Sequence, residues 1–127
     1  MSTAYYALFH SLARTCADLL IGSAGSDRSK HAWQQAYRAI DHGTAKNACK
    51  DDKITKFPKP IEDFANAFLS MQEKRHGADY DPFVKLKKSV VVQDIATVKQ
   101  TIIDFASAPL KDRRAFCAFV VFKRRKE

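Results

Sequence analysis

The chain has 127 residues, of which 46% are hydrophobic and 28% charged, so it is long enough for one domain with its own core and too short for two. Four glycines and four prolines exclude collagen-like or low-complexity material. The 22 Lys and Arg against 14 Asp and Glu give a net charge of +8, which favours a polyanionic partner such as nucleic acid or a nucleotide.

The N-terminal segment predicts an amphipathic helix over residues 3–22, which Gly22 can end. The loop that follows, residues 22–27, lacks the Gly-Lys-Ser/Thr ending of a phosphate-binding loop, so we expect a linker. The apolar face of the helix has a regular 3-4 spacing and consists of Tyr5, Leu8, Phe9, Leu12, Cys16, Leu19 and Leu20.

A second helix is predicted to start after Asp27 or Ser29. We expect Gly43 to end or bend it, and Thr44 to cap a short continuation through Cys49. Its apolar face consists of Trp33, Ala36, Tyr37 and Ile40.

Residues 50–60 contain lysines, aspartates and two prolines, which indicates an irregular connection. A third helix is then predicted from Pro60 to near Gly77. Its inward face consists of Ile61, Phe64, Ala65, Phe68 and Leu69.

The segment from Pro82 to Val92 is ambiguous, because its three consecutive valines suit either a short strand or the start of a helix. We prefer a helix that continues to Ala106, since the apolar spacing does not change. The positions of its apolar face are Val91, Ile95, Val98, Ile102, Phe105 and Ala106.

The last predicted helix, residues 109–125, carries much of the positive charge. Residues 101–127 hold seven basic and three acidic side chains, which is half of the net charge. These cations either complement the helix dipole and keep an apolar helix soluble, or contact phosphate. The apolar face includes Leu110, Cys117, Val120 and Val121. The five helices predict a single all-α domain over residues 1–127, built as an up-and-down bundle.

Local spacing excludes several kinds of active site. No His/Cys cluster has zinc-ligand spacing, and neither a Gly-x-Ser-x-Gly nucleophile elbow nor a dinucleotide fingerprint occurs, so we expect no metal and no cofactor. Cys16, Cys49 and Cys117 are odd in number and far apart, which favours reduced core thiols. The longest apolar run, residues 115–122, is too short for a membrane span and no signal peptide is evident, so we expect a cytoplasmic protein without membrane contact.

Two polar stretches are not explained by packing alone. On the first helix, Tyr6 and His10 lie on a seam beside the apolar face, where Ala13 and Ala17 would let another helix approach closely. His10 is either a partly buried, hydrogen-bonded core histidine or a functional group at that seam.

The second polar stretch, residues 75–81, stands where we expect the third helix to give way to a turn. Arg75 either forms an ion pair with Asp79 or Asp81, or contributes with His76 to a phosphate-binding pocket.

Together, Tyr-Tyr-Ala-Leu-Phe-His at 5–10 and Arg-x-x-Ala-Asp-Tyr at 75–80 in a short all-α chain resemble the HEPN domain family (higher eukaryotes and prokaryotes nucleotide-binding). The order and spacing of the predicted helices agree, so the resemblance covers most of residues 3–108. It implies a helical bundle that usually dimerises. Many members are RNA-cleaving toxins or defence effectors, and others are partners of small nucleotidyltransferases or non-catalytic nucleotide binders.

The resemblance marks this chain as a divergent member. The ribonucleases of the family carry an Arg and a His separated by four to six residues, and no Arg of this chain has a His at that distance downstream. From Arg75, the positions for the motif histidine hold Tyr80, Asp81 and Pro82.

Three functions are therefore open. One is a metal-independent ribonuclease, toxin-like, in which Arg75 stabilises the charged phosphate and His10 or His76 acts as acid or base. Another is a non-catalytic bundle that pairs with itself or with a nucleotidyltransferase-type protein. The preferred one is a homodimeric module, in a defence or toxin–antitoxin setting, that binds RNA or a nucleotide phosphate through Tyr6, Arg75, Asp79, Tyr80, Lys123, Arg124 and Arg125.

Overall fold

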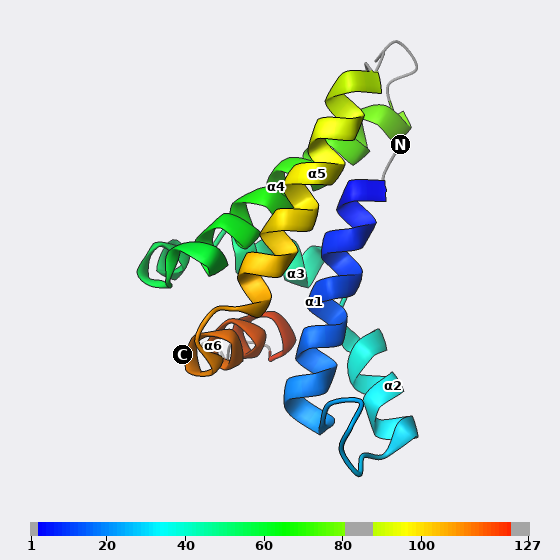
Figure 1. Ribbon diagram of the computed structural model, residues 1–127, viewed down its shortest axis with the longest axis vertical. Coiled ribbons are helices and arrows are strands. Elements are labelled where there is room, and N and C mark those ends of the chain that lie inside the picture. Colours follow the sequence, from blue (N-terminus) through cyan, green and yellow to red (C-terminus); the bar gives the residue numbers. More distant parts are fainter. Residues whose placement is uncertain (1–2, 81–87, 123–127) are drawn as a thin grey trace.

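The computed structural model describes residues 3–80 and 88–122, and all the regular structure within them is helical (Figure 1). The three longest helices, α1 (Thr3–Ile21), α4 (Lys59–Tyr80) and α5 (Lys88–Ala106), pack against one another. This arrangement confirms the predicted all-α bundle. In the described part of the chain no helix has the length and apolar character that a bilayer span requires.

Helix α1 is central to the core, because it packs against α2, α4, α5 and α6. Its predicted apolar face is correct over most of its length, with Tyr5, Leu8, Leu12 and Cys16 buried. The prediction is wrong for Leu20, which is 53% exposed because the last turn of α1 extends beyond the end of α5 (Figure 1).

Helix α2 (Lys30–Ala39) lies outside the core. Its N-cap is Ser29, whose hydroxyl accepts a hydrogen bond from the backbone N–H of Ala32. None of its residues is buried, and Trp33 on the predicted apolar face is only half-buried. The chain turns at Ile40, directly after the helix, and this side chain does enter the core.

Helix α3 (His42–Cys49) begins earlier than predicted. Its N-cap is Asp41 rather than Thr44, because the Asp41 carboxylate accepts hydrogen bonds from both the backbone N–H and the hydroxyl of Thr44, at 2.7 and 2.8 Å. These bonds lower the pKa of Asp41. Gly43 therefore lies inside α3 and does not end a helix, and the described part of the chain has six α-helices where five were expected.

A short 3-10 turn, η1 (Asp52–Lys56), joins α3 to α4 and buries Ile54. Helix α4 continues past Gly77 to Tyr80, so the stretch around Arg75 is helical and the turn expected there is wrong. The inward face of α4 is as predicted at its four fully buried positions, Ile61, Phe64, Ala65 and Phe68.

Helix α5 contains the three consecutive valines, which confirms the helical interpretation for residues 88–92, whereas residues 82–87 lie outside the described part. Val98 and Phe105 are buried as expected. Ile95 is 41% exposed, so the apolar face was predicted too wide, because α5 is packed on one side only, against α1 and α4.

Helix α6 (Leu110–Val121) closes the core through Phe116, a residue that the apolar spacing did not single out. The Phe116 ring meets the rings of Phe64 and Phe105 edge-on, with centroids 6.1 and 5.9 Å away, while Phe64 and Phe105 stack at 4.3 Å. Leu110 is 43% exposed at the start of the helix, so its predicted burial is wrong.

The three cysteines are buried and form no disulfide, in agreement with the prediction of core thiols. A hydrogen bond with the Cys117 thiol, together with burial, raises the pKa of Cys16. Burial alone raises the pKa of Cys49 to about 12. The Cys16 and Cys49 thiols therefore remain protonated at neutral pH.

Candidate functional site

Arg75 joins the two stretches that the sequence singled out. Although 69 positions separate them, the Arg75 Nη2 donates a hydrogen bond of 3.0 Å to the hydroxyl of Tyr6. The guanidinium lies above two rings of α1, 5.1 Å from the centroid of Tyr6 and 5.5 Å from that of Tyr5. The cation is thus held by the electron-rich faces of two phenols.

Behind this cation, the phenol of Tyr5 is hydrogen-bonded to the Nδ1 of His42 on α3. Gln72 donates its amide N–H to the same phenol oxygen, at 3.3 Å, so the phenol's own proton points to His42. Burial raises the pKa of Tyr5 to about 12. Burial and the charge of Arg75 lower the pKa of His42, so at neutral pH this ring is an uncharged acceptor.

His10 is exposed, and its Nδ1 is hydrogen-bonded to the hydroxyl of Tyr37 at 2.6 Å. The partly buried core position that was one alternative for this histidine is therefore wrong. Its ring plane lies within 27° of that of Tyr6 and 14° of that of Tyr37, and both centroids are 6.1 Å away. The hydrogen bond through Nδ1 places Tyr37 at the edge of the imidazole ring. Trp33 continues the series at 5.3 Å from Tyr37.

Asp18 holds α2 in place beside these rings. Its carboxylate accepts hydrogen bonds from the Nη1 of Arg28, at 3.0 Å, and from the indole N–H of Trp33, at 2.8 Å. Arg28 also donates to the carbonyl of Gly22 and lies 4.7 Å above the Trp33 ring. Gly22 has a φ of 132°, which side chains rarely adopt, and this conformation turns the chain back toward α1.

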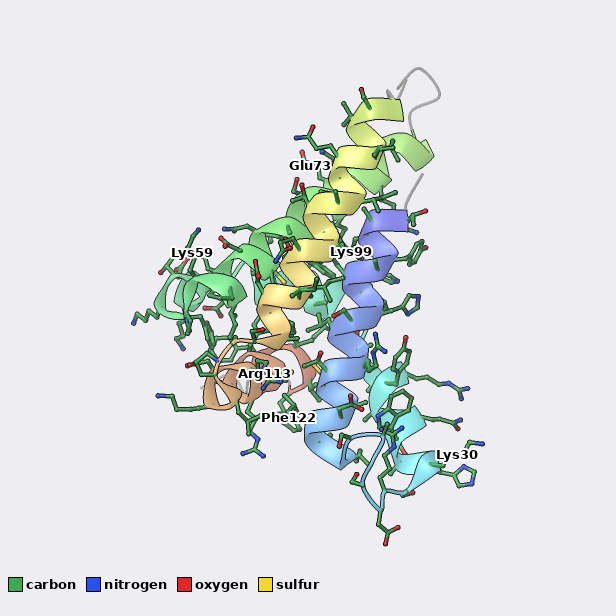
Figure 2. All side chains as sticks on the ribbon, viewed as in Figure 1. Lys30, Lys59, Glu73, Lys99, Arg113 and Phe122 are labelled. Carbon is green, nitrogen blue, oxygen red and sulfur yellow. The ribbon has the colours of Figure 1, made fainter. Side chains whose placement is uncertain are left out.

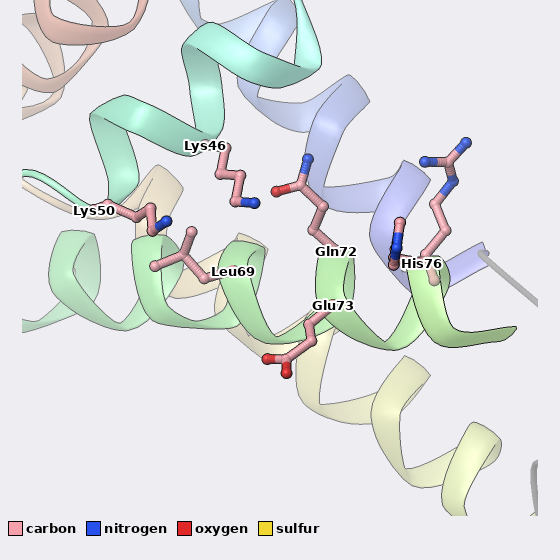
Figure 3. A pocket seen from close by; sticks show the side chains of 7 residues that line it. Lys46, Lys50, Leu69, Gln72, Glu73 and His76 are labelled. Carbon is pink, nitrogen blue, oxygen red and sulfur yellow. The ribbon is translucent and has the colours of Figure 1, made fainter. Parts of the chain in front are cut away.

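A cavity of about 590 Å³ opens between α3 and α4 (Figure 3). Figure 3 shows Lys46 of α3 and Gln72 of α4 reaching toward each other across it, whereas the carboxylate of Glu73 points to the other side of α4. The side-chain oxygen of Gln72 is buried and has no hydrogen-bond partner among the described residues. The lining consists of Lys46, Lys50, Leu69, Gln72, Glu73, Arg75 and His76.

This lining is strongly cationic. The described lining holds three basic side chains, Lys46, Lys50 and Arg75, against the one carboxylate of Glu73. The arrangement suits an anion with several oxygen acceptors, because lysine and arginine donate charge-assisted hydrogen bonds from more than one side.

The structure brings together four of the residues that the sequence proposed. Tyr6, His10 and Arg75 are in one contact network, and His76 lines the cavity beside Arg75. The backbones of Asp79 and Tyr80 belong to the last turn of α4, but their side chains lie outside the described residues, as does Asp81. The pairing of Arg75 with either aspartate therefore remains a prediction.

The basic C-terminal residues Lys123, Arg124 and Arg125 also lie outside the described part. Helix α6, which leads to them, packs against α1, α3 and α4, and none of its described residues lines the cavity at Arg75. In Figure 1, α6 lies away from the C-terminal end of α4 that carries Arg75. A contribution of the C-terminal cations to phosphate binding remains a prediction.

Sequence reasoning missed the contribution of α3. His42, Lys46 and Lys50 are spaced four residues apart, which places them on one face of a helix, and this spacing was the available signal. The local pattern makes this segment a continuation of the preceding helix, and in that register the shared face of the three residues is not apparent. Gln72 and Tyr37 gave no comparable signal, because their roles depend on partners far away in the sequence.

Among residues 3–80 and 88–122, no three His, Cys, Asp or Glu side chains come close enough to hold a metal ion. Comparisons with protein-family models, with curated proteins and with solved structures find no match to this chain.

Proposed function

We propose that this chain binds the phosphate of RNA or of a free nucleotide in the cavity between α3 and α4. The observation that carries the proposal is the convergence of Lys46, Lys50 and Arg75, from two helices, on one cavity of about 590 Å³. A phosphate group carries the negative charge and the several acceptor oxygens that such a set of donors recognises. The net charge of +8 supports the same class of ligand, since it attracts polyanions over a longer range.

Arg75 is the fixed part of this site. Its contacts with Tyr5 and Tyr6 restrict the side chain before any ligand arrives, so less conformational entropy is lost on binding. Lys46 and Lys50 are exposed and long, and they can adjust to the ligand.

The test is the salt dependence of binding to a labelled single-stranded RNA and to a nucleoside triphosphate. Loss of one phosphate contact should reduce the slope of log K against log salt by about 0.7 for single-stranded RNA. We expect this reduction for Lys46→Ala and Lys50→Ala. The matched control is Lys99→Ala (labelled in Figure 2), which removes the same charge from an exposed position of α5, and no described residue of α5 lines the cavity. Equal losses in all three variants, or no binding by the unaltered protein at low salt, would refute the proposal.

A ribonuclease activity is the second candidate, and it is favoured by the position of His76 beside Arg75 in the cavity lining. In such a reaction a neutral histidine takes the proton of the 2′-hydroxyl and the 2′-oxygen attacks phosphorus. The bond to the 5′-oxygen breaks, this oxygen takes a proton from water and leaves as a hydroxyl, and a 2′,3′-cyclic phosphate remains. Incubation of RNA with the protein and a metal chelator tests it. Cleavage that is lost in His76→Ala or His10→Ala supports the activity, and intact RNA after long incubation excludes it.

A further inference from the structure

The rings of Tyr6, His10, Tyr37 and Trp33 form a continuous series along the junction of α1 and α2, which we name the aromatic row. Successive centroids are 6.1, 6.1 and 5.3 Å apart, and the interplanar angles are 27°, 14° and 29°. The hydrogen bond through the in-plane Nδ1 of His10 joins His10 and Tyr37 at their edges, so these two rings do not cover each other's faces. His10, in the middle of the row, is exposed.

Cations accompany the row along its length. Arg75 lies over Tyr6 at one end and Arg28 lies over Trp33 at the other. Arg14 is exposed one helical turn beyond His10, on the same face of α1. The negative charge of Asp18, the next residue of this face, is countered by Arg28 at 3.0 Å.

The row also continues directly from the cavity, because Arg75 both lines the cavity and holds Tyr6. A chain molecule with phosphates in the cavity can therefore reach the rings without leaving the surface of the protein. Aromatic faces between cations are the usual surface for unpaired bases, which stack on rings while their phosphates contact Lys and Arg.

We propose that the aromatic row binds unpaired bases, and that the ligand is single-stranded RNA several nucleotides long; this inference rests on the proposed function and names its substrate class. In a duplex the faces of the bases are covered by the neighbouring base pairs, so they cannot stack on the rings of the aromatic row. A mononucleotide whose phosphate lies in the cavity has no further base for the rings of His10 and Tyr37.

The experiment compares a short oligoadenylate, the same oligonucleotide in a duplex with oligouridylate, and adenosine monophosphate. Binding is measured by fluorescence anisotropy and, independently, by the emission of Trp33. Since Trp33 is the single tryptophan of the chain and stands in the row, its emission reports directly on this surface.

We expect the single strand to bind more tightly than the duplex and to change Trp33 emission. Tyr37→Leu and His10→Gln should each weaken single-strand binding by about five- to a hundredfold, the effect of losing one stacked base. Tyr37→Phe keeps the ring and should lose less. Phe122→Leu, which removes an exposed ring at the end of α6, should bind as the unaltered protein does.

The outcomes separate this inference from the proposed function. If the single strand binds in a Lys46-dependent way while Tyr37→Leu and His10→Gln have no effect, the row is not a base-binding surface and the phosphate site stands. Equal affinity for duplex and single strand also overturns the inference. If adenosine monophosphate binds and RNA does not, the inference fails and the phosphate site stands. If neither binds, both proposals fail. Should Tyr37→Leu lose helix content in circular dichroism, His10→Gln decides, because its position lies on the firmly packed α1.

Discussion

Replacing Asp18 by Ala should release α2 without unfolding the rest of the protein. No residue of α2 is buried, and only partly buried side chains such as Tyr37 pack against the core, so this helix depends mainly on its contacts with α1. Asp18 of α1 accepts a hydrogen bond from Trp33 of α2 and another from Arg28, which precedes α2. The side chains of Asp18 and Arg28 are 33% and 24% exposed, so in the variant water replaces part of the hydrogen bonding that the Asp18 carboxylate provided.

Hydrogen bonds to a charged group contribute about 1.5–3 kcal/mol each when buried, and partial exposure reduces the pair to about 2 kcal/mol in total. The amide hydrogens of α2 should then exchange about 30-fold faster in Asp18→Ala. Amides of α4, which is anchored by Phe64 and Phe68, should change little. Hydrogen exchange measured by NMR checks both expectations.

The matched control is Asp63→Ala, which removes an ion pair with Lys59 whose partners are 47% and 81% exposed, and which should leave α2 unchanged. Trp33 emission gives a second readout, since the indole loses its carboxylate partner only in Asp18→Ala. Two results would refute the reasoning: equal acceleration of exchange in α2 and α4, or no acceleration in α2.

Three further predictions concern titration and the core. The pKa of His42 in the folded protein is lowered from its ordinary value of 6.5, so as the pH falls the unfolded chain takes up the imidazole proton before the folded protein does. The urea midpoint of unfolding should therefore fall as the pH drops below about 6.5, and it should fall less in His42→Gln. Ultraviolet titration should show the Tyr5 phenol ionising at a pH of about 12, and Tyr5→Phe should lack this contribution. Thermal and urea unfolding should give a loss of about 3–5 kcal/mol for Phe116→Ala, against less than about 1 kcal/mol for Leu110→Ala; equal losses would contradict the packing described for α6.

Most of the fold follows from local periodicity. The 3-4 spacing of apolar residues is a property of each helix alone, and it correctly placed Leu8 and Leu12 in the core. It failed at Leu20 and Leu110, where the helix pattern continues but the neighbouring helices do not cover it. Periodicity describes one element, whereas burial depends on which elements lie beside it.

The candidate site was predicted only in part, for the same reason. Sequence patterns singled out Tyr6 and Arg75 separately, but their contact depends on the packing of α1 against α4. The N-cap of α3 was predicted at Thr44 instead of Asp41, and this error concerns side-chain chemistry rather than the packing of helices. A carboxylate that accepts two hydrogen bonds makes a better N-cap than the threonine hydroxyl three residues later, and this shift turned α3 into an independent helix.

The rate at which the buried cysteines react with a thiol reagent reports how often the core of the protein opens. A thiol reagent attacks the thiolate, and the raised pKa values of Cys16 and Cys49 make their thiolates scarce. Both of these cysteines and Cys117 are buried, on α1, α3 and α6. Under native conditions the labelling rate of each cysteine therefore measures how often these helices separate. Since α2 contains no cysteine, detachment of α2 alone does not change the labelling rates, which report only on opening of the core.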